Sequence, residues 1–159
     1  MRKLLFLSTL IIVLSLSACL PLLEPNVAGF SENLVKNLND YLDGQISSET
    51  FIERFIYTTD SATTTDARFF GNKFLSFFDE NASEVSLVGY GDSGLKFYTA
   101  VENPPNWVEK VYVLSLLLKT DEKMLTHSCP MLLIEGKPYF LTVYASGTQI
   151  VSYPVLEER

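Results

Sequence analysis

The chain has few basic residues and no run of them. Its 159 residues include 12 Lys and Arg against 19 Asp and Glu, which gives a formal net charge of −7. Nucleic acids and anionic lipid surfaces are bound through clustered Lys or Arg side chains that neutralise phosphates, so this charge balance argues against both as partners. The acidic residues are scattered along the chain, which favours a role in solubility over a functional acidic patch.

The chain also has little of what metal sites need. It holds one histidine, His127, and two cysteines, Cys19 and Cys129. His127 and Cys129 are too few for a zinc site, which takes three or four protein ligands. The loop acids Asp121 and Glu122 do not follow the spacing of a calcium loop. We therefore expect neither a metal nor a cofactor.

The N-terminus, in contrast, carries a distinct pattern. Arg2 and Lys3 precede an apolar run over residues 4–13, and small residues follow at Ser17 and Ala18. A positive start, an apolar middle and a small-residue end are the parts of a secretory signal. The run is shorter than the roughly 20 apolar residues that a permanent membrane helix needs. We therefore expect residues 1–18 to be a signal peptide.

The end of this segment, Leu16-Ser17-Ala18-Cys19, resembles the lipobox of bacterial lipoproteins. In that family the cysteine thiol takes a diacylglyceryl group, cleavage follows just before it, and the new amine is usually acylated. The resemblance implies lipidation at Cys19 and a lipid anchor in the cell envelope. Family members retained in the inner membrane tend to have Asp after the cysteine, and here that residue is Leu20. In a host with two membranes this implies the outer membrane, facing the periplasm, and otherwise the outer face of the cytoplasmic membrane.

A plain secretion signal or an uncleaved anchor, with an incidental cysteine, is the alternative to a lipoprotein signal. Under the lipoprotein interpretation, removal of residues 1–18 takes away two of the twelve basic residues and moves the charge from −7 to −9. Cys129 is then the one free thiol, so no internal disulfide can form.

Residues 20–25 carry two prolines that exclude a helix across them, and at full extension they reach on the order of 20–25 Å. We expect residues 19–26 to be a short lipidated tether that holds one domain, residues 27–159, close to the bilayer.

The first half of that domain shows helical periodicity, with apolar residues at three- and four-residue steps. Three helices are predicted, over residues 27–42, from residue 48 onward, and over about 67–78, with Asn26, Ser47 and Asp66 as their N-caps. The hydroxyl-rich residues 58–65 before the third helix are predicted to form a loop.

After residue 81 the periodicity becomes that of strands. Strands are predicted at residues 85–90, 95–101, 107–119, 125–134, 139–145 and 148–153, and the first two form a hairpin. Because Pro130 cannot donate to a sheet ladder, it predicts an edge, a bulge or a break in its strand.

This element order predicts an α+β domain of about three N-terminal helices packed on a curved antiparallel sheet of five or six strands. The order resembles that of the nuclear-transport-factor-like cone or of a cystatin-like helix on a sheet. Such a likeness concerns the fold and does not imply a function.

Aromatic residues on the predicted strands are the candidates for contact with a ligand or partner. A tyrosine has an apolar ring and a polar tip that suit a pocket or an interface, although strands favour tyrosine in any case. Trp107 follows the stiff pair Pro104-Pro105, and it suits either an interface anchor or a core residue. The candidate contact residues are Trp107, Tyr90, Tyr98, Tyr112, Tyr139 and Tyr144.

No catalytic residue is expected. His127 and Cys129 are two residues apart and face the same side of a strand, but a thiol nucleophile needs a lowered pKa and an oriented base. Two functions stay open. The first is a non-catalytic envelope lipoprotein that binds a protein or a small ligand, and the second is a small-molecule-processing enzyme of the cone type, with a pocket between helices and sheet. The predicted strands offer few ionisable groups for such a pocket, namely His127, Glu84, Glu102, Glu109 and Glu135, which favours binding.

Overall fold

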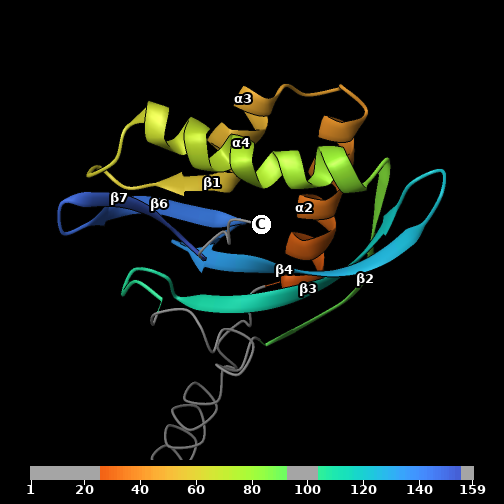
Figure 1. Ribbon diagram of the computed structural model, residues 1–159. Helices are drawn as coiled ribbons and strands as arrows, with labels where there is room; N and C mark the ends of the chain where they lie inside the picture. The colour runs from red at the N-terminus through yellow and green to blue at the C-terminus, as the bar shows by residue number, and fades with distance from the viewer. Residues whose placement is uncertain (1–25, 93–103, 155–159) are drawn as a thin grey trace, which may run out of the picture.

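The computed structural model describes residues 26–92 and 104–154 (Figure 1). These residues form three helices and seven strands, so the chain has the expected α+β composition. The helices are α2 (Val27–Leu42), α3 (Ser48–Phe55) and α4 (Thr64–Asn81). The strands are β1 (Ile56–Thr58), β2 (Glu84–Asp92), β3 (Lys110–Lys119), β4 (Met124–Ile134), β5 (Lys137–Tyr139), β6 (Leu141–Ser146) and β7 (Gln149–Tyr153).

The strands form two sheets, and the prediction of one antiparallel sheet with five or six strands is wrong. One sheet has the order β2-β3-β4-β5 and is antiparallel, and the other has the order β1-β6-β7, with β1 parallel to β6. The predicted strand over residues 139–145 is divided at Phe140, so that β5 pairs with β4 while β6 pairs with β1 and β7. One stretch of chain therefore links the two sheets.

Strand β1 lies where the sequence predicted the end of a helix and the start of a loop. The N–H of Ile56 still bonds to the C=O of Ile52 as the C-cap of α3, and at Ile56 the backbone becomes extended. The β-branched residues Thr58 and Thr59 favour that extended conformation.

The helix starts confirm two of the three predicted N-caps. Asn26 Oδ1 accepts a hydrogen bond from the Gly29 N–H (3.0 Å), and Ser47 Oγ accepts one from Thr50 (3.2 Å). Helix α4 starts earlier than predicted, because Thr63 is its N-cap. Asp66 instead closes a capping box, in which its carboxylate accepts from the Thr63 N–H (2.8 Å). These bonds from Thr63 hold the pKa of the Asp66 carboxyl below its usual value.

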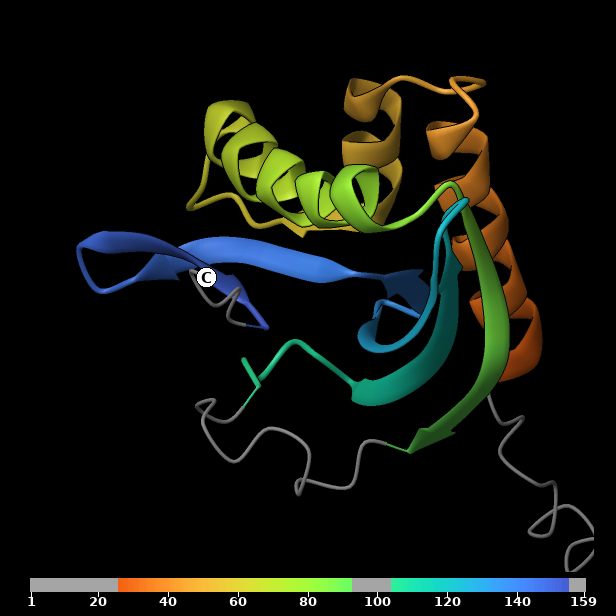
Figure 2. The ribbon, with the colours of Figure 1, turned by 45° about the vertical axis from the view of Figure 1, so that its right-hand side comes forward.

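The helices cover the two sheets differently. Helix α2 contacts β2 and β5, the outer strands of the four-stranded sheet, which curves around it, whereas α3 and α4 lie over the three-stranded sheet (Figures 1 and 2). Asn39 fixes α2 in place, because its side chain donates to the Val85 C=O (2.7 Å) and accepts from the Val85 N–H (2.8 Å). Within residues 26–92 and 104–154, no helix is long and apolar enough to cross a membrane.

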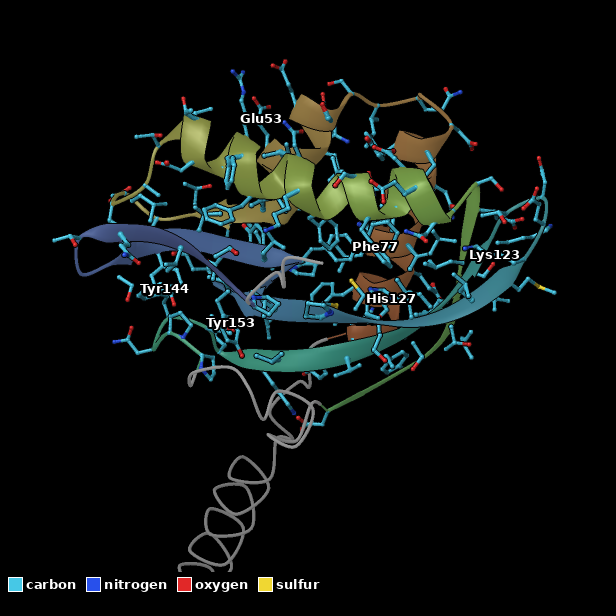
Figure 3. The ribbon with its side chains drawn as sticks, in the orientation of Figure 1. Glu53, Phe77, Lys123, His127, Tyr144 and Tyr153 are labelled. Carbon is cyan, nitrogen blue, oxygen red and sulfur yellow. The ribbon has the colours of Figure 1, made fainter. Side chains whose placement is uncertain are left out.

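Neighbouring strand residues point to opposite faces, and the two faces carry separate apolar clusters. We call the cluster under the helices the helix-side core, and its largest fully buried residues are Phe51, Phe78 and Phe140. We call the other the aromatic cluster; it comprises Val111, Leu132, Ile134, Tyr153, Tyr57, Trp107, Val108, Tyr139 and Tyr144. Figure 3 shows Tyr144 and Tyr153 on the side of the strands away from α4.

The prediction for Pro130 is confirmed as an edge. On one side of β4, Pro130 is paired with Val113 of β3, but on the other side β5 pairs only with residues 132–134. Pro130 therefore lies where β4 has one neighbour among the described strands. The predicted partner of β2, residues 95–101, lies outside the described residues.

Candidate functional site

Three of the predicted contact residues come together in the aromatic cluster. The rings of Trp107 and Tyr144 pack edge to face with centroids 5.1 Å apart, and Tyr139 packs edge to face on Tyr57 at 5.3 Å. Tyr57 and Tyr153 belong to the same cluster and were missed as candidates. Tyr153 ends a predicted strand, so its strand position was the signal that could have included it.

The other candidates lie elsewhere. Tyr112 is 5% exposed and belongs to the helix-side core, while Tyr90 is 48% exposed on β2, an outer strand. Cys19 and Tyr98 lie outside the described residues. The structure therefore divides the candidate set between a cluster, a core position and a surface position.

One buried polar atom in the aromatic cluster and one beside it lack hydrogen-bond partners among the described residues. Among the described side chains, Trp107 Nε1 and Thr142 Oγ1 are buried and have no hydrogen-bond partner. Thr142 pairs in register with Tyr57 on one side and Tyr153 on the other, so it shares their face of the sheet. Each unpaired buried polar group lowers the stability of the fold by about 1–3 kcal/mol. The region around the aromatic cluster therefore has more unmet hydrogen-bonding capacity than the helix-side core.

His127 and Cys129 face the same side of β4, as their spacing predicts, and that side carries the helices. Cys129 is fully buried, and burial raises the pKa of its thiol, which is the opposite of what a nucleophile needs. The His127 ring packs on Phe77 of α4 with centroids 4.4 Å apart (Figure 3). Both residues thus take part in packing between β4 and the helices.

A groove of about 560 Å³ lies along β1. It is lined by Ile52, Glu53, Ile56, Tyr57, Thr58, Thr59, Asp60, Ala62, Thr64, Ala67 and Tyr139. Four consecutive residues, 56–59, line it, although side chains of a strand alternate between faces. The groove therefore follows the outer edge of β1, the edge that faces away from β6.

Carboxylates lie close to Tyr57 and Tyr139, the two tyrosines of this groove. Among the described residues, Glu53 and Asp60 are the only charged ones that line the groove, and both are exposed. The Tyr57 hydroxyl donates to Glu135 Oε1 at 3.4 Å. Burial raises the pKa of Tyr57, and the nearby Glu135 and Asp60 raise it further. Burial and Glu135 likewise raise the pKa of Tyr139, so both hydroxyls stay protonated at neutral pH.

Comparison with known proteins adds no relative. No protein-family model, no curated protein and no solved structure matches the chain. Among the residues described, no three His, Cys, Asp or Glu side chains are grouped so that they could hold a metal ion. The β1 groove is thus the feature from which a function can be inferred.

Proposed function

We propose that the protein is a cell-envelope lipoprotein, anchored through Cys19, whose domain binds a partner or ligand without catalysis. The observation that carries the binding function is the β1 groove, which combines an open strand edge with the rings of Tyr57 and Tyr139. Exposed strand edges and aromatic-lined grooves are two common means of recognising peptides and small ligands. The lipobox-like Leu16-Ser17-Ala18-Cys19 supports the anchor.

Two features favour binding over the alternative, an enzyme with a pocket between helices and sheet. In the described part of the chain, the space under the helices is filled by Phe51, Phe78 and Phe140, each 0% exposed. Enzymes tune acids and bases by burial, whereas Glu53 and Asp60 of the groove are exposed. Neither place combines a cavity with a buried acid.

The position of α2 supports an orientation of the domain on the membrane. Helix α2 starts at Val27, eight residues after Cys19, and extends about 24 Å. Its first turn lies at the end of the domain away from α3 and the start of α4 (Figures 1 and 2). With a short tether at that end, we expect the β1 groove to face away from the bilayer, where a partner can reach it.

The anchor is tested by metabolic labelling with a fatty acid. Wild-type protein should take up label and lose residues 1–18, whereas Cys19→Ser should accumulate as unlabelled precursor. Cys129→Ser is the matched control, because it removes the other thiol and should leave labelling unchanged. A wild-type protein that takes up no label would show that the anchor is absent.

A further inference from the structure

We propose that the β1 groove takes an extended basic peptide, which adds as a strand to the outer edge of β1 and places a Lys or Arg side chain beside Tyr57, Glu53 and Asp60. This inference rests on the proposed binding function and specifies the chemistry of its partner.

The backbone of β1 offers hydrogen-bonding groups to the groove. The Phe55 C=O accepts from the N–H of Phe140, the residue directly before β6 (2.9 Å), and the Thr59 N–H donates to the Val143 C=O of β6 (3.1 Å). Both groups therefore point to the side on which β6 lies. Alternate residues of a parallel strand bond to the same neighbour. The C=O of Ile56 and both backbone groups of Thr58 therefore point the other way, into the groove.

These groups suit the addition of a short strand. The N–H of Ile56 is already bonded to the Ile52 C=O, which leaves two acceptors and one donor along the edge. In an antiparallel ladder, one residue of an added peptide can exchange both bonds with Thr58, and a neighbouring N–H can reach Ile56. Since only three bonds are available, side chains must supply the rest of the affinity and the specificity.

The groove walls select a positive side chain. The faces of Tyr57 and Tyr139 attract cations, and Glu53 and Asp60, the two charged residues in the described part of the lining, are both negative. Arg54 and Lys137 are close in sequence to groove residues but are not part of its lining. Acidic peptides would therefore meet repulsion, while Ile52, Ile56 and Ala67 offer apolar contact to the remaining side chains.

The probe for this inference is the synthetic peptide acetyl-Lys-Val-Lys-Val-Lys-amide, titrated calorimetrically against the full-length protein in detergent micelles. It should bind at least about tenfold more tightly than the matching Glu-Val-Glu-Val-Glu peptide, since about 1.4 kcal/mol of charge and cation–π attraction gives that factor. The double variant Glu53→Gln/Asp60→Asn should lose most of this preference.

Two controls separate the groove from general attraction to an acidic protein. Glu32→Gln/Glu80→Gln removes two exposed charges elsewhere and should leave the affinity within about twofold. A basic peptide that is N-methylated at all five residues has no residue N–H to donate to β1 and should bind more weakly. The unmodified peptide should also slow hydrogen exchange at the Thr58 amide.

Several results would overturn the inference. These are equal binding of basic and acidic peptides, equal loss of affinity in the two double variants, full binding of the N-methylated peptide, or no binding at all. The labelling test at Cys19 is independent, so failure of the peptide test is distinguishable from failure of the proposed anchor.

Discussion

The helix-side core and the aromatic cluster share strands β1, β3, β4 and β6 but differ in chemistry, and the helix-side core also takes residues from the helices. The helix-side core is rich in phenylalanine, and Phe51 packs against four other rings, those of Tyr41, Phe55, Phe74 and Phe140. The aromatic cluster uses Trp and Tyr and is partly exposed. Among the described residues, Trp107 Nε1 in this cluster and Thr142 Oγ1 beside it are buried and have no hydrogen-bond partner. The first is suited to carry the stability of the fold, and the second has polar capacity that the described protein groups do not use.

The β1 groove lies where these two regions meet. Ile52 and Ile56 of its lining belong to the helix-side core, and Tyr57 and Tyr139 belong to the aromatic cluster. β1 is one of the two outer strands of the three-stranded sheet, so the groove at its edge takes residues from both regions. In the proposed binding surface, apolar contact comes from residues of both regions, and polar contact comes from the backbone of β1 and from Glu53 and Asp60.

The largest effect should come from truncation in the helix-side core. Phe51→Ala removes a fully buried ring and should lower the free energy of unfolding by about 3–5 kcal/mol, measured by urea denaturation. Phe69→Ala is the control, because Phe69 is 64% exposed and its loss should change stability by no more than about 0.5 kcal/mol. Equal effects of the two changes would mean that the helix-side core does not dominate stability.

A smaller effect of opposite sign is expected beside the aromatic cluster. Thr142→Val replaces a buried hydroxyl that has no hydrogen-bond partner among the described residues with a methyl group, and it should raise the free energy of unfolding by about 1 kcal/mol. Thr126→Val on the exposed part of β4 is the control and should be nearly neutral. A loss of stability in Thr142→Val would show that the hydroxyl is hydrogen-bonded, for instance by water, and would remove this contrast between the two regions.

The sequence predicted the parts of the fold that depend on local chemistry. Helical periodicity and side-chain caps placed α2 and α3 and identified Asn26 and Ser47, because caps act within one turn. The sequence did not predict β1, because a strand of three residues is too short to show an alternating pattern. It also missed the division into two sheets, because the break at Phe140 depends on which distant strands pair on either side of it.

The candidate site was predicted only in part, because it also depends on contacts between segments that are distant in the sequence. Trp107, Tyr139 and Tyr144 lie on or beside predicted strands, so their aromatic character was informative. Tyr57 lies at the junction of α3 and β1, where the sequence predicted no strand. The groove itself joins residues 52–67 to Tyr139, and nothing local to either segment indicates that contact.

The smallest expected effect is a change in fluorescence. It tests whether the aromatic cluster can be loosened without unfolding the helix-side core. Trp107 is the only tryptophan, is half-buried and packs on Tyr144, so its emission reports on this cluster alone. Tyr144→Ala should red-shift the emission and increase quenching by acrylamide, and it should lower the urea midpoint less than Phe51→Ala does. Tyr144→Phe retains the ring contact and should keep the wild-type spectrum. If Tyr144→Ala leaves the spectrum unchanged, Trp107 is held by other contacts; if it destabilises the protein as much as Phe51→Ala, the two regions unfold as one cooperative unit.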